Sequence, residues 1–396
     1  MPVPPPPTAR TAESSAGALV PRDSADLLAV LRDGTPRTRA QLAHETGLAR
    51  STVAARLEAL MDADLIAAAA DAASSGGRPP ARVTFNAGAR VVLAVDLGAT
   101  HGVIALADLA GTVLLTEAAP LTIADGPERV LGWALETAKR LLKASRRPAR
   151  DLAGVGVGVP GPVEHSTGMP INPPIMPGWD RFDIPAFIRQ TFDVPVLVDN
   201  DVNVLALGEH AVSWPREDDL LFVKVSTGIG LGIIAGGSLQ RGAAGSAGDL
   251  GHVRVPFTRD TPRHGDEDAD LEALASGPAI ARYVAERGTP AATSADVLAL
   301  ARAGNADAVA GIRQAGRDLG EVLATCVNLF NPSVIVVGGS IARAGEHLLA
   351  GIREVVYRQS TPLATQHLQI VPAAAGETGG VLGAAIMAAQ HVLEPA

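Results

Sequence analysis

The densest run of glycines in the chain lies between residues 228 and 272, and it constrains the fold more than any other stretch. The run opens as V-S-T-G-I-G-L-G-I-I-A-G-G (225–237), continues as R-G-A-A-G-S-A-G-D-L-G-H (241–252) and leads to L-E-A-L-A-S-G (271–277). Glycines between β-branched residues indicate strands joined by tight turns and a backbone that closely approaches another group. The polar side chains expected to face that group are Asp249, His252 and Glu272.

The length of 396 residues and the hydrophobic fraction of 47% suit two or three domains with large cores. No apolar run approaches the roughly 18 residues of a membrane span, and the Pro-rich residues 1–21 lack the apolar segment of a secretory signal. Cys326 is the only cysteine, which excludes an internal disulfide and a multi-cysteine zinc site. We therefore expect a cytoplasmic protein without membrane contact, preceded by a disordered tail over residues 1–21.

The charge is unevenly distributed along the chain. Residues 1–90 contain ten arginines and nine acidic residues, whereas the remainder carries a net charge of about −10. The basic residues are almost all arginine, the exceptions being Lys139, Lys143 and Lys224. A polyanion such as DNA would be repelled by the acidic remainder but not by the N-terminal part.

Residues 22–88 show the pattern of a winged helix-turn-helix domain. Ser24 is suited to cap a first helix, and T-R-A-Q (38–41) is a capping box that starts a second one. After the turn E-T-G (45–47), apolar residues at helical spacing predict a third helix over roughly residues 50–62. Two helices joined by a short glycine turn are typical of the helix-turn-helix motif.

The second helix of that motif enters the DNA major groove by its N-terminal end. Strand-like stretches at 65–70 and 82–85 flank S-S-G-G-R-P-P, and would form a β-wing with an arginine at its tip. Ala49 stands where Ser or Thr would usually cap the third helix, which weighs against a strong binder. A small packing or protein-interaction domain is the alternative, and the arginine-tipped wing favours DNA. The residues expected to contact DNA are Arg50, Ser51, Thr52, Arg56 and Arg78.

The chain after residue 89 begins with three strands joined by tight turns, the first of which lies in R-V-V-L-A-V-D-L-G-A-T (90–100). A helix is expected over residues 125–145 and a buried, glycine-containing strand over 152–159. A short strand at 195–198 then leads into D-N-D-V-N (199–203), which opens another helix. This order of elements is typical of an α/β lobe.

The same pattern returns from residue 219. Three strands are expected at 220–228, 231–237 and 250–255, followed by helices, a buried strand within 332–340 and a final helix over 377–390. The duplication predicts two similar lobes around a cleft. Lobe one would comprise about residues 89–213 plus the C-terminal helix 377–392, and lobe two about residues 214–376.

Several motifs together resemble those of the ROK family, which contains sugar kinases and sugar-responsive repressors. The resemblance covers about residues 22–392 and rests on D-L-G-A-T, V-P-G-P-V (159–163), D-N-D-V-N, the stretch from V-S-T-G-I-G-L-G-I to G-D-L-G-H, and V-V-G-G (336–339). It implies an α/β actin-like ATPase fold of the sugar-kinase type, with two lobes around a cleft behind an N-terminal winged helix. A winged helix in this place is the arrangement of the family's transcriptional regulators.

The resemblance also implies a hexose-like ligand. Carboxylates accept hydrogen bonds from neighbouring hydroxyl groups and an amide supplies a donor, and such groups are costly to bury without partners. The structural alternative is that Asp201 caps the helix that it opens and Asp249 caps a turn. The residues implied to bind the sugar are Asn200, Asp201, Asp249, His252 and Glu272.

In the family's kinases the aspartate at the position of Asp201 deprotonates the sugar hydroxyl that attacks ATP, while glycine loops and Mg²⁺ hold the phosphates. Ala99 stands where the kinases usually have a second glycine, and His101 where Lys or Arg is common, which weighs against ATP binding. Asp201 would be catalytic only if kinase activity is retained. The phosphate-loop positions are Asp96, Gly98, Thr100, Thr227, Gly228, Gly230, Gly338 and Gly339.

The family pattern also places C-x-C-G-x-x-G-C after the motif histidine, which builds a His-Cys₃ zinc site. Here residues 263–270 read R-H-G-D-E-D-A-D, and the cysteine positions are taken by Arg263, Gly265 and Asp270. We expect that the zinc site is lost, that a solvated acidic loop replaces it and that the ring of His252 is not fixed. A replacement site that uses His264 and the acids is the alternative. No cofactor is therefore expected to be required.

The expected function is a sugar-responsive transcriptional regulator, a repressor that a sugar in the cleft releases from DNA. Its partners would be a double-stranded DNA operator and a small sugar or sugar derivative. Because such regulators bind paired half-sites, a homodimer or homotetramer is expected. An ATP-dependent hexose kinase with a DNA-binding appendage is the alternative, and a constitutive DNA binder whose lobes only oligomerise is a third hypothesis.

Overall fold

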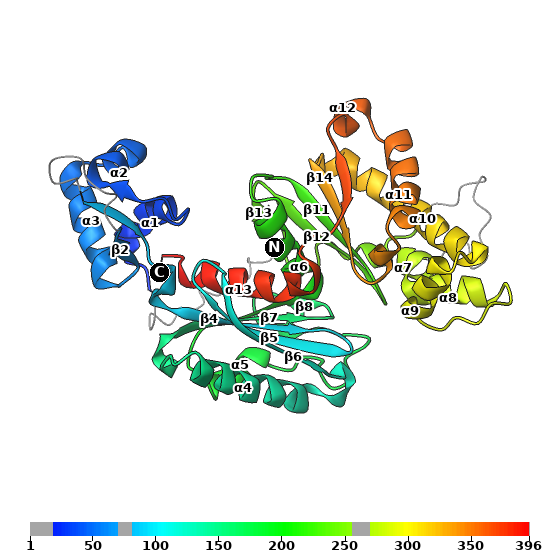
Figure 1. Cartoon of the computed structure of the whole chain (residues 1–396), viewed down its shortest axis with the longest axis horizontal. Coiled ribbons are helices and arrows are strands. Elements are labelled where there is room, and N and C mark those ends of the chain that lie inside the picture. Colours follow the sequence, from blue (N-terminus) through cyan, green and yellow to red (C-terminus); the bar gives the residue numbers. More distant parts are fainter. Residues whose placement is uncertain (1–18, 70–80, 256–269, 396) are drawn as a thin grey trace, which may run out of the picture. The chain divides into compact units, whose positions relative to one another are not determined.

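The structure is a computed structural model that describes residues 19–69, 81–255 and 270–395. Two units are distinguished in it, residues 1–90 with 389–396, and residues 91–388 (Figure 1). The C-terminal residues join the first unit by a parallel bridge between Val20 and Pro395. The expected tail lies, up to residue 18, outside the described residues, as does the expected wing tip, and the domain boundaries drawn from the sequence stay predictions.

The first unit contains three helices and a three-stranded antiparallel sheet within the described residues. The helices are α1 (Ala25–Leu31), α2 (Arg39–Thr46) and α3 (Arg50–Asp62). The sheet has the order β1-β3-β2, with β1 (Arg37–Thr38), β2 (Ile66–Ala68) and β3 (Arg82–Phe85). Buried leucines and Val53 fill the space between the helices. The helix-turn-helix pattern and the two strands of the wing are therefore confirmed.

The caps of these helices were only partly predicted. The capping box is confirmed, since Thr38 Oγ1 accepts from the backbone N–H of Gln41, and the Gln41 side chain accepts from that of Thr38. The expected Ser24 cap is wrong: its hydroxyl donates to the Arg56 carbonyl at 3.4 Å. A capping side chain needs an extended backbone, whereas Ser24 closes a 3-10 turn (Arg22–Ser24) with ψ of 0°.

The second unit is built on two five-stranded sheets with the same topology. In each sheet the first three strands in sequence are antiparallel neighbours and two later strands add in parallel on the other side. The first sheet has the order β10-β7-β4-β5-β6, from β4 (Val91–Leu97), β5 (His101–Asp108), β6 (Val113–Pro120), β7 (Leu152–Val159) and β10 (Val196–Asn200). The second has the order β13-β12-β11-β14-β15, from β11 (Leu220–Val225), β12 (Ile229–Ala235), β13 (Ser238–Leu239), β14 (Val334–Gly338) and β15 (Gln369–Pro372). The predicted duplication is confirmed.

One predicted strand is wrong. Residues 250–255 do not form the third strand of the second sheet; they begin as a 3-10 turn (Leu250–His252), and the third strand is the short β13. Gly242, Gly245 and Gly248 all have positive φ, so the chain turns repeatedly between β13 and Leu250. Leu250 and Val255 are buried all the same, which explains why the apolar pattern resembled a strand.

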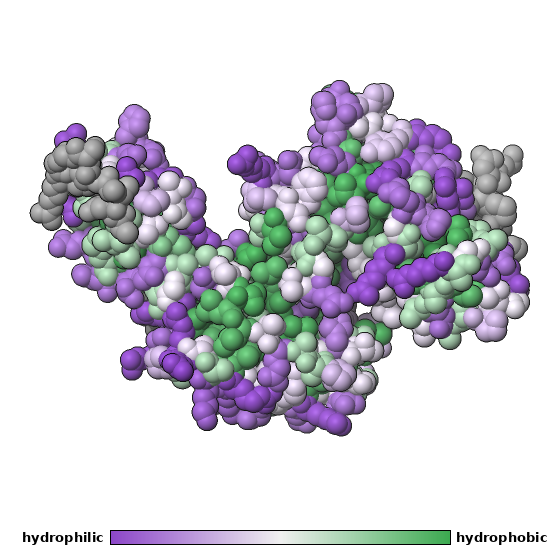
Figure 2. All heavy atoms as spheres, viewed as in Figure 1, coloured by the Kyte–Doolittle hydropathy of each residue, from purple (hydrophilic) through white to green (hydrophobic). Residues whose placement is uncertain are grey.

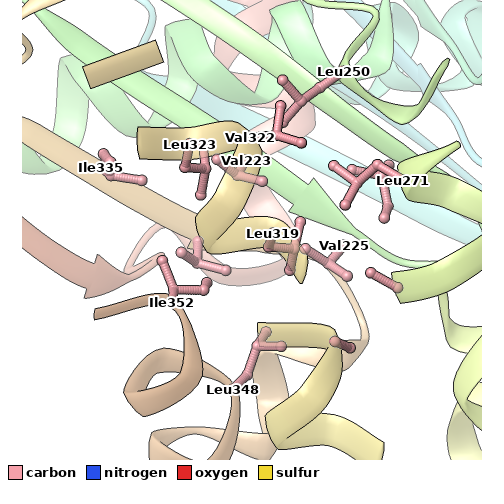
Figure 3. Close-up of a cluster of buried hydrophobic side chains, with 14 of the residues drawn as sticks. Val223, Val225, Leu250, Leu271, Leu319, Val322, Leu323, Ile335, Leu348 and Ile352 are labelled. Atoms are coloured by element: carbon pink, nitrogen blue, oxygen red, sulfur yellow. The ribbon is translucent and has the colours of Figure 1, made fainter. Parts of the chain in front are cut away.

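The helices of the second unit pack on these sheets and give each its own core. The first core lies between sheet one, α4 (Pro127–Ala144) and the buried Trp179. The second lies between sheet two and the pair α10 (Ala306–Phe330) and α11 (Glu346–Gln359), where Val223, Leu319 and Ile352 belong to one buried cluster (Figure 3). The helices are α4 (Pro127–Ala144), α5 (Ile184–Arg189), α6 (Asp201–Ser213), α7 (Leu271–Ala275), α8 (Gly277–Ala285), α9 (Ser294–Arg302), α10 (Ala306–Phe330), α11 (Glu346–Gln359), α12 (Pro362–Thr365) and α13 (Gly379–Val392).

Hydrophilic residues cover much of both units on the face shown in Figure 2. Among the described residues, none of the helices combines the length and the apolar character that crossing a membrane requires.

Candidate functional site

The start of α6 is where the D-N-D motif meets the V-P-G-P-V motif. β10 ends at Asn200, whose backbone is extended and whose side-chain oxygen accepts from the Val202 N–H at 2.9 Å. The side-chain amide of Asn200 donates to the Gly161 carbonyl at 2.8 Å. Asn200 therefore caps α6, and the alternative that Asp201 caps this helix is wrong.

The carboxylate of Asp201 lies instead in a buried charge cluster, which we define as Asp96, Asp201 and Lys224. Asp201 is 6% exposed, and its Oδ2 accepts from Lys224 Nζ at 2.5 Å. Burial raises the pKa of Asp96 to about 7, with a further contribution from the negative charge of Asp201, while Lys224 acts in the opposite direction. Gly380 of α13 packs directly against the Asp96 carboxylate, where a side chain would collide with it. The cluster thus joins strands of both sheets with α6.

A second buried acid of the D-N-D motif, Asp199, has its own cation. Arg241 Nε donates to Asp199 Oδ2 at 2.6 Å, and Oδ1 accepts from the Asn203 amide at 2.8 Å. Asp199 is 2% exposed, so this pairing is what makes its burial tolerable. Arg241, Asp199 and Lys224 were not predicted from the sequence as parts of the candidate site. Lys224 could have been found from the sequence, because it is flanked by Val223 and Val225 in an otherwise apolar strand.

Glu272 holds the glycine turn at the start of β12. Its Oε2 accepts from the Ile229 N–H at 3.0 Å, and a Cβ on Gly228 would lie 2.8 Å from the same oxygen. The glycine at position 228 is therefore required by a carboxylate of this chain. Asp249 lies nearby with its carboxylate exposed, and its side chain makes no capping bond, so the alternative that it caps a turn is wrong.

The ring of His252 is fixed by carboxylates. Its Nδ1 lies 3.1 Å from Asp270 Oδ2, and its Nε2 lies 4.0 Å from Asp249 Oδ1. The main cause that raises the pKa of His252 is the hydrogen bond that the Asp270 carboxylate accepts from its ring, and the negative charges of Asp249 and Glu272 add to it. The expectation of an unfixed ring is therefore wrong. Three predicted sugar contacts, Asp249, His252 and Glu272, do lie together.

Asp270 occupies one of the cysteine positions of the family's zinc pattern, and it pairs with the histidine that the pattern uses as a ligand. The other two positions, Arg263 and Gly265, lie outside the described residues, as does His264. The residues at those positions offer no thiolate, so they do not fit a His-Cys₃ zinc site. Within the ranges that the structure describes, no three His, Cys, Asp or Glu side chains are grouped to hold a metal ion.

The glycines expected at phosphate loops are explained by contacts inside the protein. A Cβ on Gly230 would lie 2.7 Å from Val202 of α6, and one on Gly338 would lie 2.6 Å from the Phe222 ring. Gly339 has φ of +91° and packs against the Val225 backbone. The His101 ring covers Gly98, while Thr100 and Thr227 are exposed. Close packing inside the protein therefore favours glycine at positions 230, 338 and 339 without a ligand.

In the first unit, the predicted DNA contacts differ in their surroundings. Arg50 and Ser51 are exposed at the start of α3, and Thr52 is half-buried. Arg56, one turn later, forms an ion pair of 2.6 Å with Asp26 of α1. Arg78 lies outside the described residues. The structure therefore presents the first turn of α3 to solvent, while Arg56 is held against α1.

Comparison with known proteins gives matches over most of the chain. Residues 92–391 match the model of the ROK family. The xylose repressor of Bacillus spizizenii is 27% identical over 369 residues, which are 93% of this chain and 95% of the repressor. A glucokinase of Halalkalibacterium halodurans is 30% identical over 312 residues, which are 74% of this chain and 93% of the kinase.

A solved structure of a ROK family transcriptional regulator, a homologue of the Escherichia coli MLC protein, matches with a TM-score of 0.80 and 27% identity. The match covers 94% of this chain and 96% of the regulator. The expected fold class is therefore confirmed: a winged helix followed by two lobes of the actin-like ATPase fold.

Proposed function

The chain belongs to the ROK family, and on that premise we propose that it is a DNA-binding transcriptional repressor that a sugar or sugar derivative releases from DNA. One observation carries the proposal: the similarity to a named repressor and to a ROK transcriptional regulator extends over 93% and 94% of the chain. The glucokinase match, by contrast, covers 74%.

The first unit supports DNA binding through α3. Its N-terminal turn exposes Arg50 and Ser51, and a helix of this kind enters the major groove by that end. Arginine forks onto guanine or phosphate, and serine reaches phosphate oxygens. The Arg56–Asp26 ion pair connects the middle of α3 to α1. We therefore assign the contacts in the DNA groove to the first turn of α3. Arg56 can contact DNA only after its ion pair with Asp26 opens.

The second unit supports sugar binding through its acidic side chains. Asp249 and Glu272 lie close enough to His252 to act on its charge, and Asp201 adds a buried carboxylate at the start of α6. A polyol satisfies several such groups at once. A sugar that binds one conformation of the second unit more tightly shifts the population of conformations by its difference in affinity, which is how it would reduce DNA binding.

Two finer points belong to the same proposal. We infer a homodimer or homotetramer in the cytoplasm, because helix-turn-helix regulators bind paired half-sites one helical turn apart or a multiple of it. We also infer that no zinc or nucleotide is needed for DNA binding. Sedimentation of the full chain with and without operator DNA tests the first inference, and a chelator added to the DNA-binding assay tests the second.

Fluorescence anisotropy of the full chain on duplex DNA from upstream of its own gene tests the main proposal. We expect specific binding at moderate salt that D-xylose, D-glucose or N-acetyl-D-glucosamine weakens. Arg50→Ala should lose DNA affinity. Asp249→Ala should keep DNA affinity and lose the sugar response, because the exposed carboxylate of Asp249 makes no capping bond. Glu272→Ala is expected to lose the sugar response too, but it also removes the bond to Ile229.

Lack of specific DNA binding at moderate salt would refute the proposal. An Asp249→Ala variant that loses DNA binding while its sugar affinity stays intact would refute the assignment of the second unit.

The kinase remains the second candidate because Asp201 is present and because a glucokinase is 30% identical. A coupled assay of ADP release over the same sugars decides between the two. Turnover that Asp201→Asn abolishes would favour the kinase.

A further inference from the structure

Lys224 differs from the other two lysines of the chain in its surroundings. Lys139 and Lys143 are exposed on α4, whereas the Lys224 side chain is 23% exposed and lies in β11 between two buried valines. Its Nζ bonds to Asp201 Oδ2, at the start of α6, which begins at the last residue of the D-N-D motif. Moving a lysine ammonium out of water into this position costs free energy, so its charge must be balanced by the groups that it contacts.

The balance is provided by two carboxylates. Asp96 and Asp201 are 9% and 6% exposed and interact with each other, so without a cation they would bury two neighbouring negative charges. Lys224 bonds to Asp201 and acts on Asp96 as well. Asp199, the other buried acid of the D-N-D motif, is paired with Arg241 and therefore does not compete for the Lys224 ammonium.

The geometry also leaves one carboxylate oxygen of Asp201 for a ligand. Oδ2 is bonded to Lys224, and the cap of α6 is supplied by Asn200. Among the residues that the structure describes, none donates to Asp201 Oδ1. A carboxylate held at one oxygen by a cation is fixed in orientation, which is what a hydrogen-bond acceptor for a sugar hydroxyl requires.

We propose that Lys224 is a positioning residue of the sugar site: its ammonium neutralises Asp201, lessens the repulsion between Asp201 and Asp96, and orients Asp201 Oδ1 toward a sugar hydroxyl. The inference rests on the proposed function and adds a residue that makes the proposed site suitable for a neutral sugar. Lys224 itself need not touch the sugar. The charge cluster is complete without any ligand, so its role can be measured both with and without sugar.

The test uses the full chain and a double-mutant cycle of Lys224→Met and Asp201→Asn, with Lys139→Met as the matched control. We expect Lys224→Met to lower the thermal midpoint by roughly 5 °C and Asp201→Asn in that background to restore most of the loss, because it removes the uncompensated charge. Lys139→Met should change little, since its ion pair with Glu136 is exposed.

Sugar affinity is measured by calorimetry with D-xylose, D-glucose and N-acetyl-D-glucosamine between pH 6 and 8.5. Lys224→Met should weaken the affinity at pH 7 by about 10- to 100-fold, the loss expected for hydrogen bonds to a charged group. Its pH profile should change too, since removal of Lys224 raises the pKa of Asp96 further. Lys224→Arg keeps the charge and should recover part of the affinity.

A Lys224→Met variant with the affinity and pH profile of the wild type would overturn the proposal. So would a loss of stability that Asp201→Asn fails to restore. A wild-type chain that binds none of the three sugars would overturn the proposed function instead, and the unfolding cycle would still decide whether Lys224 neutralises Asp201.

Discussion

The raised pKa of Asp96 makes the second unit less stable as the pH rises. Burial is the main cause, and it favours the neutral acid in the folded state, whose pKa is about 7 against the usual 3.8. Below about pH 3 the acid is protonated in both the folded and the unfolded chain. Between about pH 3 and 7 the unfolded chain loses its proton first, so the folded state loses stability relative to it, and above about pH 8 the loss is complete.

The size of this effect follows from the two pKa values. Their difference, at about 1.4 kcal/mol per pH unit, corresponds to roughly 4 kcal/mol of unfolding free energy, taken as an upper estimate. Asp96→Asn keeps the shape of the side chain and removes its charge. We therefore expect the variant to be more stable than the wild type by up to about 4 kcal/mol at pH 8, and by only about 1 kcal/mol at pH 4.5.

Urea unfolding followed by tryptophan fluorescence measures this difference. The three tryptophans of the chain all lie in the second unit, so the signal reports the unit that contains Asp96: Trp133, Trp179 and Trp214. Asp193→Asn, at an exposed position of the same unit, is the control. The reasoning is refuted if Asp96→Asn is less stable than the wild type at pH 8, or if the difference between them does not grow with pH.

Three further predictions concern individual contacts. Ala49→Ser should stabilise α3 by about 1 kcal/mol, because position 49 has the extended backbone of a cap but no capping side chain; amide exchange in α3 that does not slow would contradict this. Asp270→Asn should lower the pKa of His252 in an NMR titration, and an unchanged pKa would show that Asp270 is not its partner. Gly383→Ala should cost more than about 2 kcal/mol, because its methyl group would meet a backbone carbonyl of α6, whereas Gly132→Ala in open space should gain up to about 1 kcal/mol; similar midpoints for the two variants would contradict the packing of α13 on α6.

Local signals in the sequence predicted most of the fold. The capping box at Thr38 and the strand Leu152–Val159 were predicted at their observed places, because their patterns depend on neighbours within a few residues. The duplicated order of strands and helices predicted two matching sheets for the same reason. The failure at residues 250–255 has the opposite cause: the apolar residues there are buried by tertiary packing without strand pairing, and a single sequence does not distinguish the two.

The candidate site was harder to predict because its bonds connect distant segments. His252 and Asp270 are 18 residues apart, and the Asp201–Lys224 pair joins α6 to β11. The role of Lys224 could nevertheless have been inferred from the sequence. Alternate residues of a strand share a face, so Lys224 lies on the face of Phe222, opposite to Val223 and Val225, which enter the second core. A single lysine on such a strand indicates a buried acid nearby.

The pattern of partners also separates the residues that shape the site from those that remain for a ligand. Both ends of the Asn200 side chain bond to the backbone, which makes it a structural residue that aligns α6. One oxygen of Glu272 holds the glycine turn, and one of Asp201 holds Lys224. Asp249 alone among these acids is exposed and makes no capping bond. Under the proposed function we therefore predict that sugar recognition depends most on Asp249, because its substitution removes none of these contacts within the fold.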